Sequence, residues 1–159
     1  MADLLVHVAS GFAVGRPMRD GRLRSLIYVG VCLPDLLYKG LLYLGGAPNW
    51  LCEPTHSPLG LVVFCYATAL LFEEDWRKRA FAALLGGAYL HVLFDLGKNY
   101  MGSGVILWAF PFSMEAVELG WYYPEDTIYL MLPALVVMLV VEAIARVARP
   151  LSARPPASP

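Results

Sequence analysis

Charged residues are scarce in this sequence, and their scarcity is the first constraint on what the protein can be. Only 16% of its 159 residues are Asp, Glu, Lys or Arg, whereas 58% are hydrophobic. Soluble domains average about 25% charged and about 45–50% apolar residues, so the composition is shifted toward that of membrane proteins. The length predicts a single domain.

Basic patches and paired cysteines are also missing. The formal net charge is −1 and no basic stretch is interleaved with aromatic residues, so nucleic acid is not expected as a partner. The three cysteines form no C-x-x-C motif, and two of them lie in apolar runs where reduced thiols pack as small hydrophobic side chains. The chain contains no internal repeat, and we expect residues 150–159 to form a disordered cytoplasmic tail.

Long apolar runs are what the sequence does have. A hydrocarbon core about 30 Å thick needs roughly 20 apolar helical residues. The runs 25–46, 58–72, 80–97 and 127–141 approach this length, and the shorter run 4–15 suits a tilted or half-inserted helix. The sequence therefore predicts an all-α fold over residues 1–149, a polytopic membrane bundle of about five transmembrane or half-inserted helices.

The basic residues alternate between successive connections, which predicts an orientation. They cluster in 16–24, 77–79 and 146–154, whereas 45–55 has none and 98–126 is mainly acidic. Basic loops stay cytoplasmic. We therefore expect an integral protein of a prokaryotic cytoplasmic membrane, with its N-terminus outside and its C-terminus in the cytoplasm; the sequence indicates no oligomeric state.

One apolar run ends in "HVLFD", which places His91 and Asp95 four residues apart. Side chains at this spacing lie on one face of a helix, about 5–6 Å apart, so both can reach one point. That geometry suits a metal ion. It equally suits a histidine–aspartate hydrogen bond that only satisfies two buried polar groups.

The remaining histidines favour the metal interpretation. At the helical rise of about 1.5 Å per residue, five metal-competent side chains fall in the middle or outer part of the bundle, and they include every histidine of the chain. Ionisable groups at such depth cost about 2.5–3.5 kcal/mol each, so they face the interior and usually have a function. The set comprises His7, Asp35, His56, His91 and Asp95.

Each member also has a simpler explanation. Asp35 and Lys39 are four residues apart and could form a salt bridge within one helix. His7 is near the terminus and could be a surface histidine. Residues 55–58, "THSP", read as a helix cap followed by proline in the first turn. Glu142 is expected to pair with the arginines that follow it near the end of the last helix.

The ordered motifs resemble a known family. "LLVHVASGFAVG", "LPDLL", "THSPLG", "HVLFDLG" and "LWAFPFS" follow one another over residues 4–113. In order and approximate spacing they resemble the YdjM-like family of membrane-bound metal-dependent hydrolases. That family is in turn similar to the all-helical fold of zinc phospholipase C and its related nucleases.

The resemblance implies a ligand set. Asp35, His56, His91 and Asp95 would surround one metal ion, and His7, sharing Asp95, would be a candidate ligand of a second. The zinc phospholipases complete a three-metal cluster with a later H-x-x-x-E helix, whereas this chain has no histidine after His91. One or two ions are therefore expected.

Nitrogen and carboxylate ligands favour zinc, with manganese or iron as alternatives. Zinc activates water near neutral pH and polarises a carbonyl or phosphoryl oxygen. Asp35 is the candidate general base, and Thr55 and Ser57 could orient the metal ligands without binding the metal themselves. Together with the membrane location, the resemblance implies hydrolysis of an ester or phosphodiester, with a lipid headgroup as the candidate substrate near the outer face.

The segment 102–126 is too long for a simple turn and is rich in aromatic residues. It could be an interfacial belt, or a lid over the site with Gly102 and Gly104 permitting movement. In the second case, substrate would be lined by Trp108, Phe110 and Phe112.

Two other classes of protein remain open. Histidines on facing helices can ligate haem, which would make the chain an electron-transfer bundle. Alternatively, the polar cluster could join helices in a non-catalytic membrane protein, with or without a structural metal.

Overall fold

The computed structural model describes residues 2–99 and 105–147, and within them the fold is helical, as the sequence predicts. Gly102, Gly104 and the tail 150–159 lie outside the described residues. The long helices are α1 (Ala2–Gly15), α2 (Gly21–Lys39), α4 (Pro58–Ala69), α5 (Glu74–Asp95) and α6 (Thr127–Val147). Shorter elements are η1 (Gly40–Leu44), α3 (Asn49–Cys52), η2 (Glu53–His56) and η3 (Pro124–Asp126).

Local chemistry accounts for the helix boundaries. The Asp20 side chain caps α2 by accepting from the backbone amides of Arg22 and Leu23. α2 then continues through Pro34 and passes into the π-helical turn η1. α5 begins six residues before the apolar run at 80, because acidic residues at positions 74 and 75 suit the positive end of a helix.

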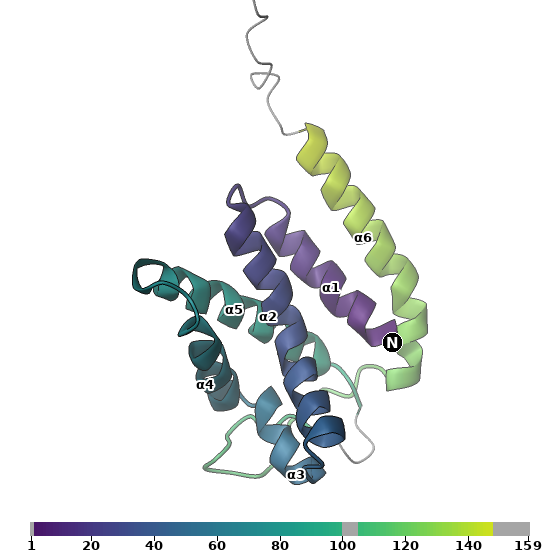
Figure 1. Cartoon of the computed structure of the whole chain (residues 1–159). Coiled ribbons are helices and arrows are strands. Elements are labelled where there is room, and N and C mark those ends of the chain that lie inside the picture. The colour runs from purple at the N-terminus through teal and green to yellow at the C-terminus, as the bar shows by residue number, and fades with distance from the viewer. Residues whose placement is uncertain (1, 100–104, 148–159) are drawn as a thin grey trace, which may run out of the picture.

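The centre of the fold is the crossing of α2 and α5 (Figure 1). Gly30 and Gly87 face each other there. A Cβ atom on Gly30 would lie 2.2 Å from the carbonyl oxygen of Leu84, and one on Gly87 would lie 2.3 Å from that of Ile27. The backbones approach this closely because neither glycine has a side chain, and beyond the crossing Asp35 of α2 lies near His91 of α5.

The other long helices surround this pair. α4 packs on α5, and α1 lies between α2 and α6 (Figure 1). The main hydrophobic core joins α2, α4 and α5, while a smaller cluster of Val6, Ala9 and Ala134 joins α1 to α6. Arg16, just after α1, donates to the Glu142 carboxylate of α6, which also accepts from Arg146.

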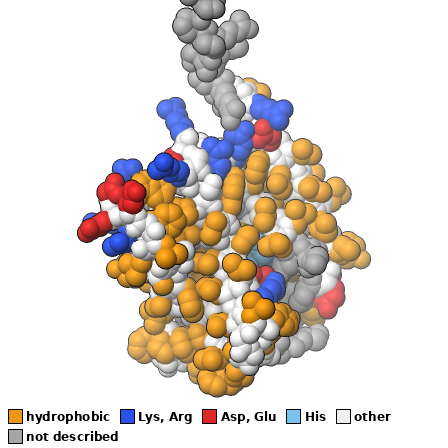
Figure 2. Space-filling model, viewed as in Figure 1, with side chains coloured by type: hydrophobic (Ala, Val, Ile, Leu, Met, Phe, Trp, Pro, Cys, Tyr) orange, Lys and Arg blue, Asp and Glu red, His pale blue; other side chains and the backbone are white. Residues whose placement is uncertain are grey.

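Two helices in the described residues have the length and composition to cross a membrane, namely Gly21–Leu44 and Thr127–Val147. α1 and α4 are apolar, but at about 1.5 Å per residue their 14 and 12 residues are shorter than a bilayer core. α6 differs from a soluble core helix, because only 6% of its most apolar window is buried. Figure 2 shows hydrophobic side chains over most of one face, with Lys and Arg gathered toward its upper and left edges.

Candidate metal centre

The structure brings together all five side chains that the sequence singled out. His7 comes from α1, Asp35 from α2, His56 from the end of η2, and His91 and Asp95 from the last turns of α5. All three histidines and Asp95 are buried, so the surface interpretation of His7 is wrong. Two overlapping groups have ligand atoms within 4.8 Å of one another, and both groups contain His91.

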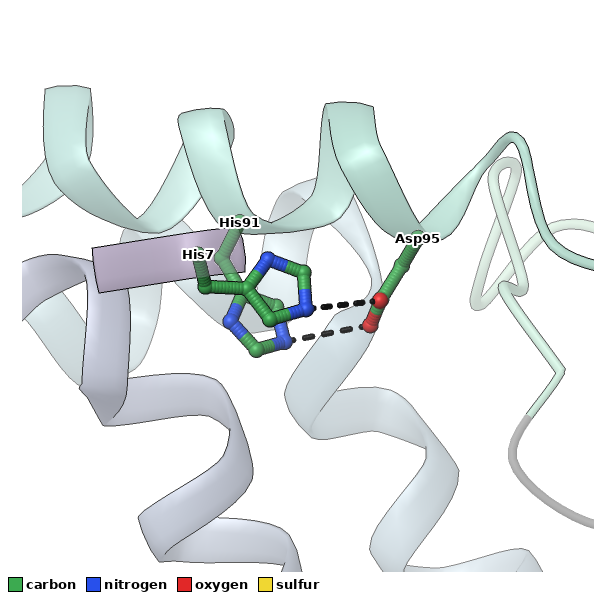
Figure 3. Close-up of side chains that lie close together, drawn as sticks. All are labelled: His7, His91 and Asp95. Atoms are coloured by element: carbon green, nitrogen blue, oxygen red, sulfur yellow. Dashed lines mark ion pairs between the residues drawn. The ribbon is translucent and has the colours of Figure 1, made fainter. Parts of the chain in front are cut away.

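Asp95 receives one histidine on each of its oxygens (Figure 3). The Nε2 atom of His7 lies 3.1 Å from Oδ1, and the Nε2 atom of His91 lies 3.1 Å from Oδ2. The two imidazoles stack with their centroids 3.9 Å apart and an interplanar angle of 20°. This stacking leaves no room for a porphyrin between the rings, which argues against haem ligation by this pair.

Asp35 is the second carboxylate of the group. Its Oδ1 atom lies 3.7 Å from Nε2 of His56 and 3.9 Å from Nε2 of His91, and His56 Nε2 lies 3.8 Å from Oδ2 of Asp95. Zinc bound tetrahedrally at about 2.0–2.1 Å keeps its ligand atoms roughly 3.3–3.4 Å apart. To enclose an ion, the separation of 3.1 Å would lengthen slightly and those of 3.7–3.9 Å would shorten by about half an ångström or less.

The salt bridge between Asp35 and Lys39 is also present, so this alternative and the metal interpretation are compatible. Lys39 contacts Oδ2, whereas Oδ1 faces the histidines. Each oxygen of the carboxylate thus has a different neighbour. The Asp35 side chain is 20% exposed, against 3% for Asp95, which makes Asp35 the more accessible of the two carboxylates.

Thr55 determines the tautomer of the neutral His56 ring. The Thr55 hydroxyl donates to the carbonyl oxygen of Cys52 at 2.8 Å, and its oxygen lies 3.0 Å from Nδ1 of His56. A hydroxyl has one proton, so Thr55 accepts from Nδ1 rather than donating to it. In the neutral ring the Nε2 atom then carries a lone pair, and this is the atom that faces both carboxylates.

Ser57 acts through the backbone. Its hydroxyl donates to the carbonyl oxygen of Pro54 at 2.8 Å and accepts from the amide of Gly60 at 3.0 Å. It is the N-cap of α4, as the sequence "THSP" predicts. Ser57 therefore fixes the junction that presents His56, while Thr55 contacts the imidazole itself.

His91 provides a test of whether a metal fits. Neither of its ring nitrogens has a hydrogen-bond partner among the described residues, although Nε2 lies 3.1 Å from Asp95. The distance is short enough for a hydrogen bond, but the geometry is not aligned for one. A buried polar group without a partner costs about 1–3 kcal/mol. An ion bound to Nε2 would satisfy that atom, so the donor set fits a divalent metal.

Lys98 is a member of the cluster that the sequence analysis missed. It is buried, and its ammonium contacts Oδ1 of Asp95, the oxygen that also faces His7. The stretch "DLGK" contained the signal, because Lys98 follows Asp95 by three residues and side chains at this spacing are neighbours on a helical turn. It was overlooked because Lys98 follows the apolar run and was counted as a loop charge.

The aromatic segment after α5 is irregular over its described part, residues 105–123. Ile106 and Leu107 are buried there, whereas Trp108 and Phe112 are exposed and Phe110 is partly buried. A substrate-lining role for Trp108, Phe110 and Phe112 stays a prediction.

No family model, curated protein or solved structure matches this chain.

Proposed function

We propose that the chain is a membrane-embedded, metal-dependent hydrolase of the YdjM-like type, with Asp35, His56, His91 and Asp95 as ligands of one zinc ion. The observation that carries this proposal is the spacing of histidine and carboxylate atoms. In the four pairs that join His56 or His91 to Asp35 or Asp95, these atoms lie 3.1–3.9 Å apart, close to the edge length of a zinc tetrahedron. Manganese or iron would suit the same mixture of nitrogen and oxygen donors.

Bound zinc would supply Lewis acidity and activate water. The residues supply the rest. Asp35 accepts the proton of the attacking water, because its carboxylate is at the cluster and is more exposed than that of Asp95. Water adds to the ester carbon or phosphorus, the bond to the leaving oxygen breaks, and that oxygen takes a proton from solvent. Thr55 holds the His56 ring so that Nε2 stays available.

A membrane lipid is the proposed substrate. An apolar cavity of about 660 Å³ lies between α1, α5 and α6, and it reaches Phe94, whose ring centroid is 6.3 Å from that of His7. The cavity thus comes near the metal cluster at Phe94, although none of the five cluster side chains lines it. We propose that a lipid acyl chain occupies it and thereby holds the headgroup bond near the ion, because the lining is almost entirely apolar. Lining residues from the three helices include Ala9, Ala13, Leu93, Leu130 and Val137.

The proposed membrane placement has five crossings, with the N-terminus outside and the C-terminus in the cytoplasm. Its support is the apolar and exposed surface of α6 and the basic residues near the α1–α2 connection and in the last turn of α6. α1 and α4 are shorter than a bilayer core, so this placement requires the bilayer to thin locally around them.

Elemental analysis of detergent-purified protein tests the proposal, with wild type beside His91→Ala. We expect close to one zinc ion per wild-type chain and loss of the ion in the variant. The zinc-loaded protein is then assayed on p-nitrophenyl acetate, bis(p-nitrophenyl) phosphate and phosphatidylglycerol in mixed micelles. A folded wild-type protein that retains no metal would show that the cluster only joins helices.

A further inference from the structure

The backbone on both sides of Lys98 is fixed. Its own amide donates to the carbonyl oxygen of Asp95 at 2.9 Å. The carbonyl oxygen of Gly97 accepts from Trp121, and the amide of Asn99 donates to Tyr122, each at 2.8 Å. The side chain is only 4% exposed. Its ammonium is therefore held beside Asp95 by the fold and is not a mobile surface charge.

Lys98 and His7 share one oxygen of Asp95. Both contact Oδ1, whereas Oδ2 faces His91 and His56. In two-metal hydrolases the ions lie about 3.5–4 Å apart, a distance that a carboxylate spans by giving one oxygen to each ion. If Asp95 bridged two ions in this way, the second ion would have to bind both Oδ1 of Asp95 and His7. The Lys98 ammonium is at this oxygen.

We infer that Lys98 takes the place of a second metal ion, so that the centre holds one ion and one fixed ammonium. This inference rests on the proposed metal centre. The ammonium gives Asp95 Oδ1 a positive partner, as a second ion would, and its charge repels a divalent cation from the position beside His7. His7 then packs on His91 and faces Asp95 instead of binding an ion.

The Lys98 charge also has a place in the proposed reaction. Two-metal sites stabilise both the attacking and the leaving oxygen of a displacement. Here one ion and one ammonium lie on the two oxygens of the same carboxylate. The fixed ammonium therefore adds positive charge beside the proposed ion, and this charge favours the negative charge that develops on a substrate oxygen.

Lys39 is the natural control. It contacts Oδ2 of Asp35 much as Lys98 contacts Oδ1 of Asp95, and it lies on the same helix as its partner. Its side chain, however, is 58% exposed. An exposed lysine can move into water at little cost, so its charge does not limit what binds to the buried side of the cluster.

The experiment is a titration of detergent-purified protein with zinc, in which the bound ions per chain are counted after gel filtration. Wild type and Lys39→Met are expected to saturate at one ion. Lys98→Met should take up a second ion in zinc excess, and Lys98→Glu should bind it more tightly because it adds a carboxylate ligand. Adding His7→Ala to either Lys98 variant should restore a count of one.

The outcomes separate this inference from the proposed function. Two ions on wild type overturn the role of Lys98 and leave the metal centre standing, whereas no ion on folded wild type removes both. A count of one in every folded Lys98 variant also overturns the inference, because the ammonium would then not be what excludes the second ion. If neither Lys98 variant folds, the number of zinc ions bound per wild-type chain is the remaining test, and two ions overturn the inference. Paramagnetic resonance of manganese-loaded Lys98→Met adds a check, since neighbouring ions couple magnetically and distant surface ions do not.

Discussion

The hydroxyl of Thr55 lies 3.0 Å from Nδ1 of His56, and the direction of this hydrogen bond decides which ring nitrogen is free to bind a metal. Replacing Thr55 with Val keeps the shape and removes the acceptor. We expect zinc to bind about 10–100-fold more weakly, the usual effect of losing such a supporting contact. Competition with a chromogenic chelator measures the change.

Two variants give this prediction its controls. Thr55→Ser keeps a hydroxyl and should retain zinc affinity within a few-fold. Ser57→Ala removes the cap of α4, which costs about 1 kcal/mol of stability, but leaves the contact to Nδ1 intact. If Ser57→Ala lowered zinc affinity as much as Thr55→Val, the effect would come from the local backbone and not from the tautomer.

The crossing of α2 and α5 gives a second prediction. Gly87→Ala would place a Cβ atom 2.3 Å from the Ile27 carbonyl oxygen, so the helices must separate. Overpacking of this kind costs about 1–3 kcal/mol, and it also moves Asp35 away from His91. We expect a lower melting temperature in detergent together with weaker zinc binding.

Its neighbour supplies a matched control. A Cβ atom on Gly86 would meet nothing within 4 Å, so Gly86→Ala should raise stability slightly through the better helix propensity of alanine. Equal destabilisation by both substitutions would mean that the close approach of α2 and α5 does not determine the geometry of the site.

The membrane orientation is a third prediction. Asn49 begins α3, and Arg77 lies in the first turns of α5, after the α4–α5 connection. Cysteines at these positions, introduced after replacing the native ones, should react with an impermeant maleimide from opposite sides in cells and inverted vesicles. Labelling of both from one side would contradict the five-crossing arrangement.

Local spacing predicted part of the site well. The contact between His91 and Asp95 follows from four-residue helical spacing, and the cap at Ser57 follows from a serine before proline. Helical rise placed the five polar residues at similar depth, and they meet in the structure. The spacing, the cap and the helical rise are properties of single helices, so the sequence contains them directly.

Contacts between segments that are far apart in the sequence could not be predicted from spacing within single helices. Arg16 meets Glu142 because α1 packs against α6, and neither helix alone indicates its neighbour. The burial of Ile106 and Leu107 was likewise unforeseen, because the irregular segment has no period from which an inward face could be read. The number of crossings was harder still, since α1 and α4 are short and the apolar run 58–72 extends beyond the end of α4.

The apolar cavity leads to a fourth prediction. Ala13 lines the cavity from α1, so Ala13→Phe should fill part of it. We expect KM to rise several-fold for long-chain phosphatidylglycerol in micelles, with little change for bis(p-nitrophenyl) phosphate, which has no acyl chain. Ala82→Phe, on an exposed position of α5, is the control. Equal effects of Ala13→Phe on both substrates would argue against an acyl chain in the cavity.

The last prediction concerns Asp95, and Lys98 determines how it must be tested. Asp95→Asn alone would leave the buried ammonium without its carboxylate, and breaking a buried ion pair in this way costs about 3–5 kcal/mol. The informative comparison is therefore Asp95→Asn in a Lys98→Met background against Lys98→Met alone. The double variant then has no buried charge at this position, and in Lys98→Met alone the Asp95 carboxylate still faces His7 and His91.

Asparagine retains one oxygen, which can accept from the imidazole of His91, and its amide nitrogen takes the place of the oxygen that faces His7, so the contact with His91 can persist in the double variant. It removes the anionic charge that attracts a divalent ion in a site shielded from water, where such charges act most strongly. We expect the double variant to fold, as judged by gel filtration and circular dichroism, and to lose its zinc. Full stoichiometric zinc in that protein would show that His91 and Asp95 form only a polar contact, and the ligand set would have to be sought elsewhere.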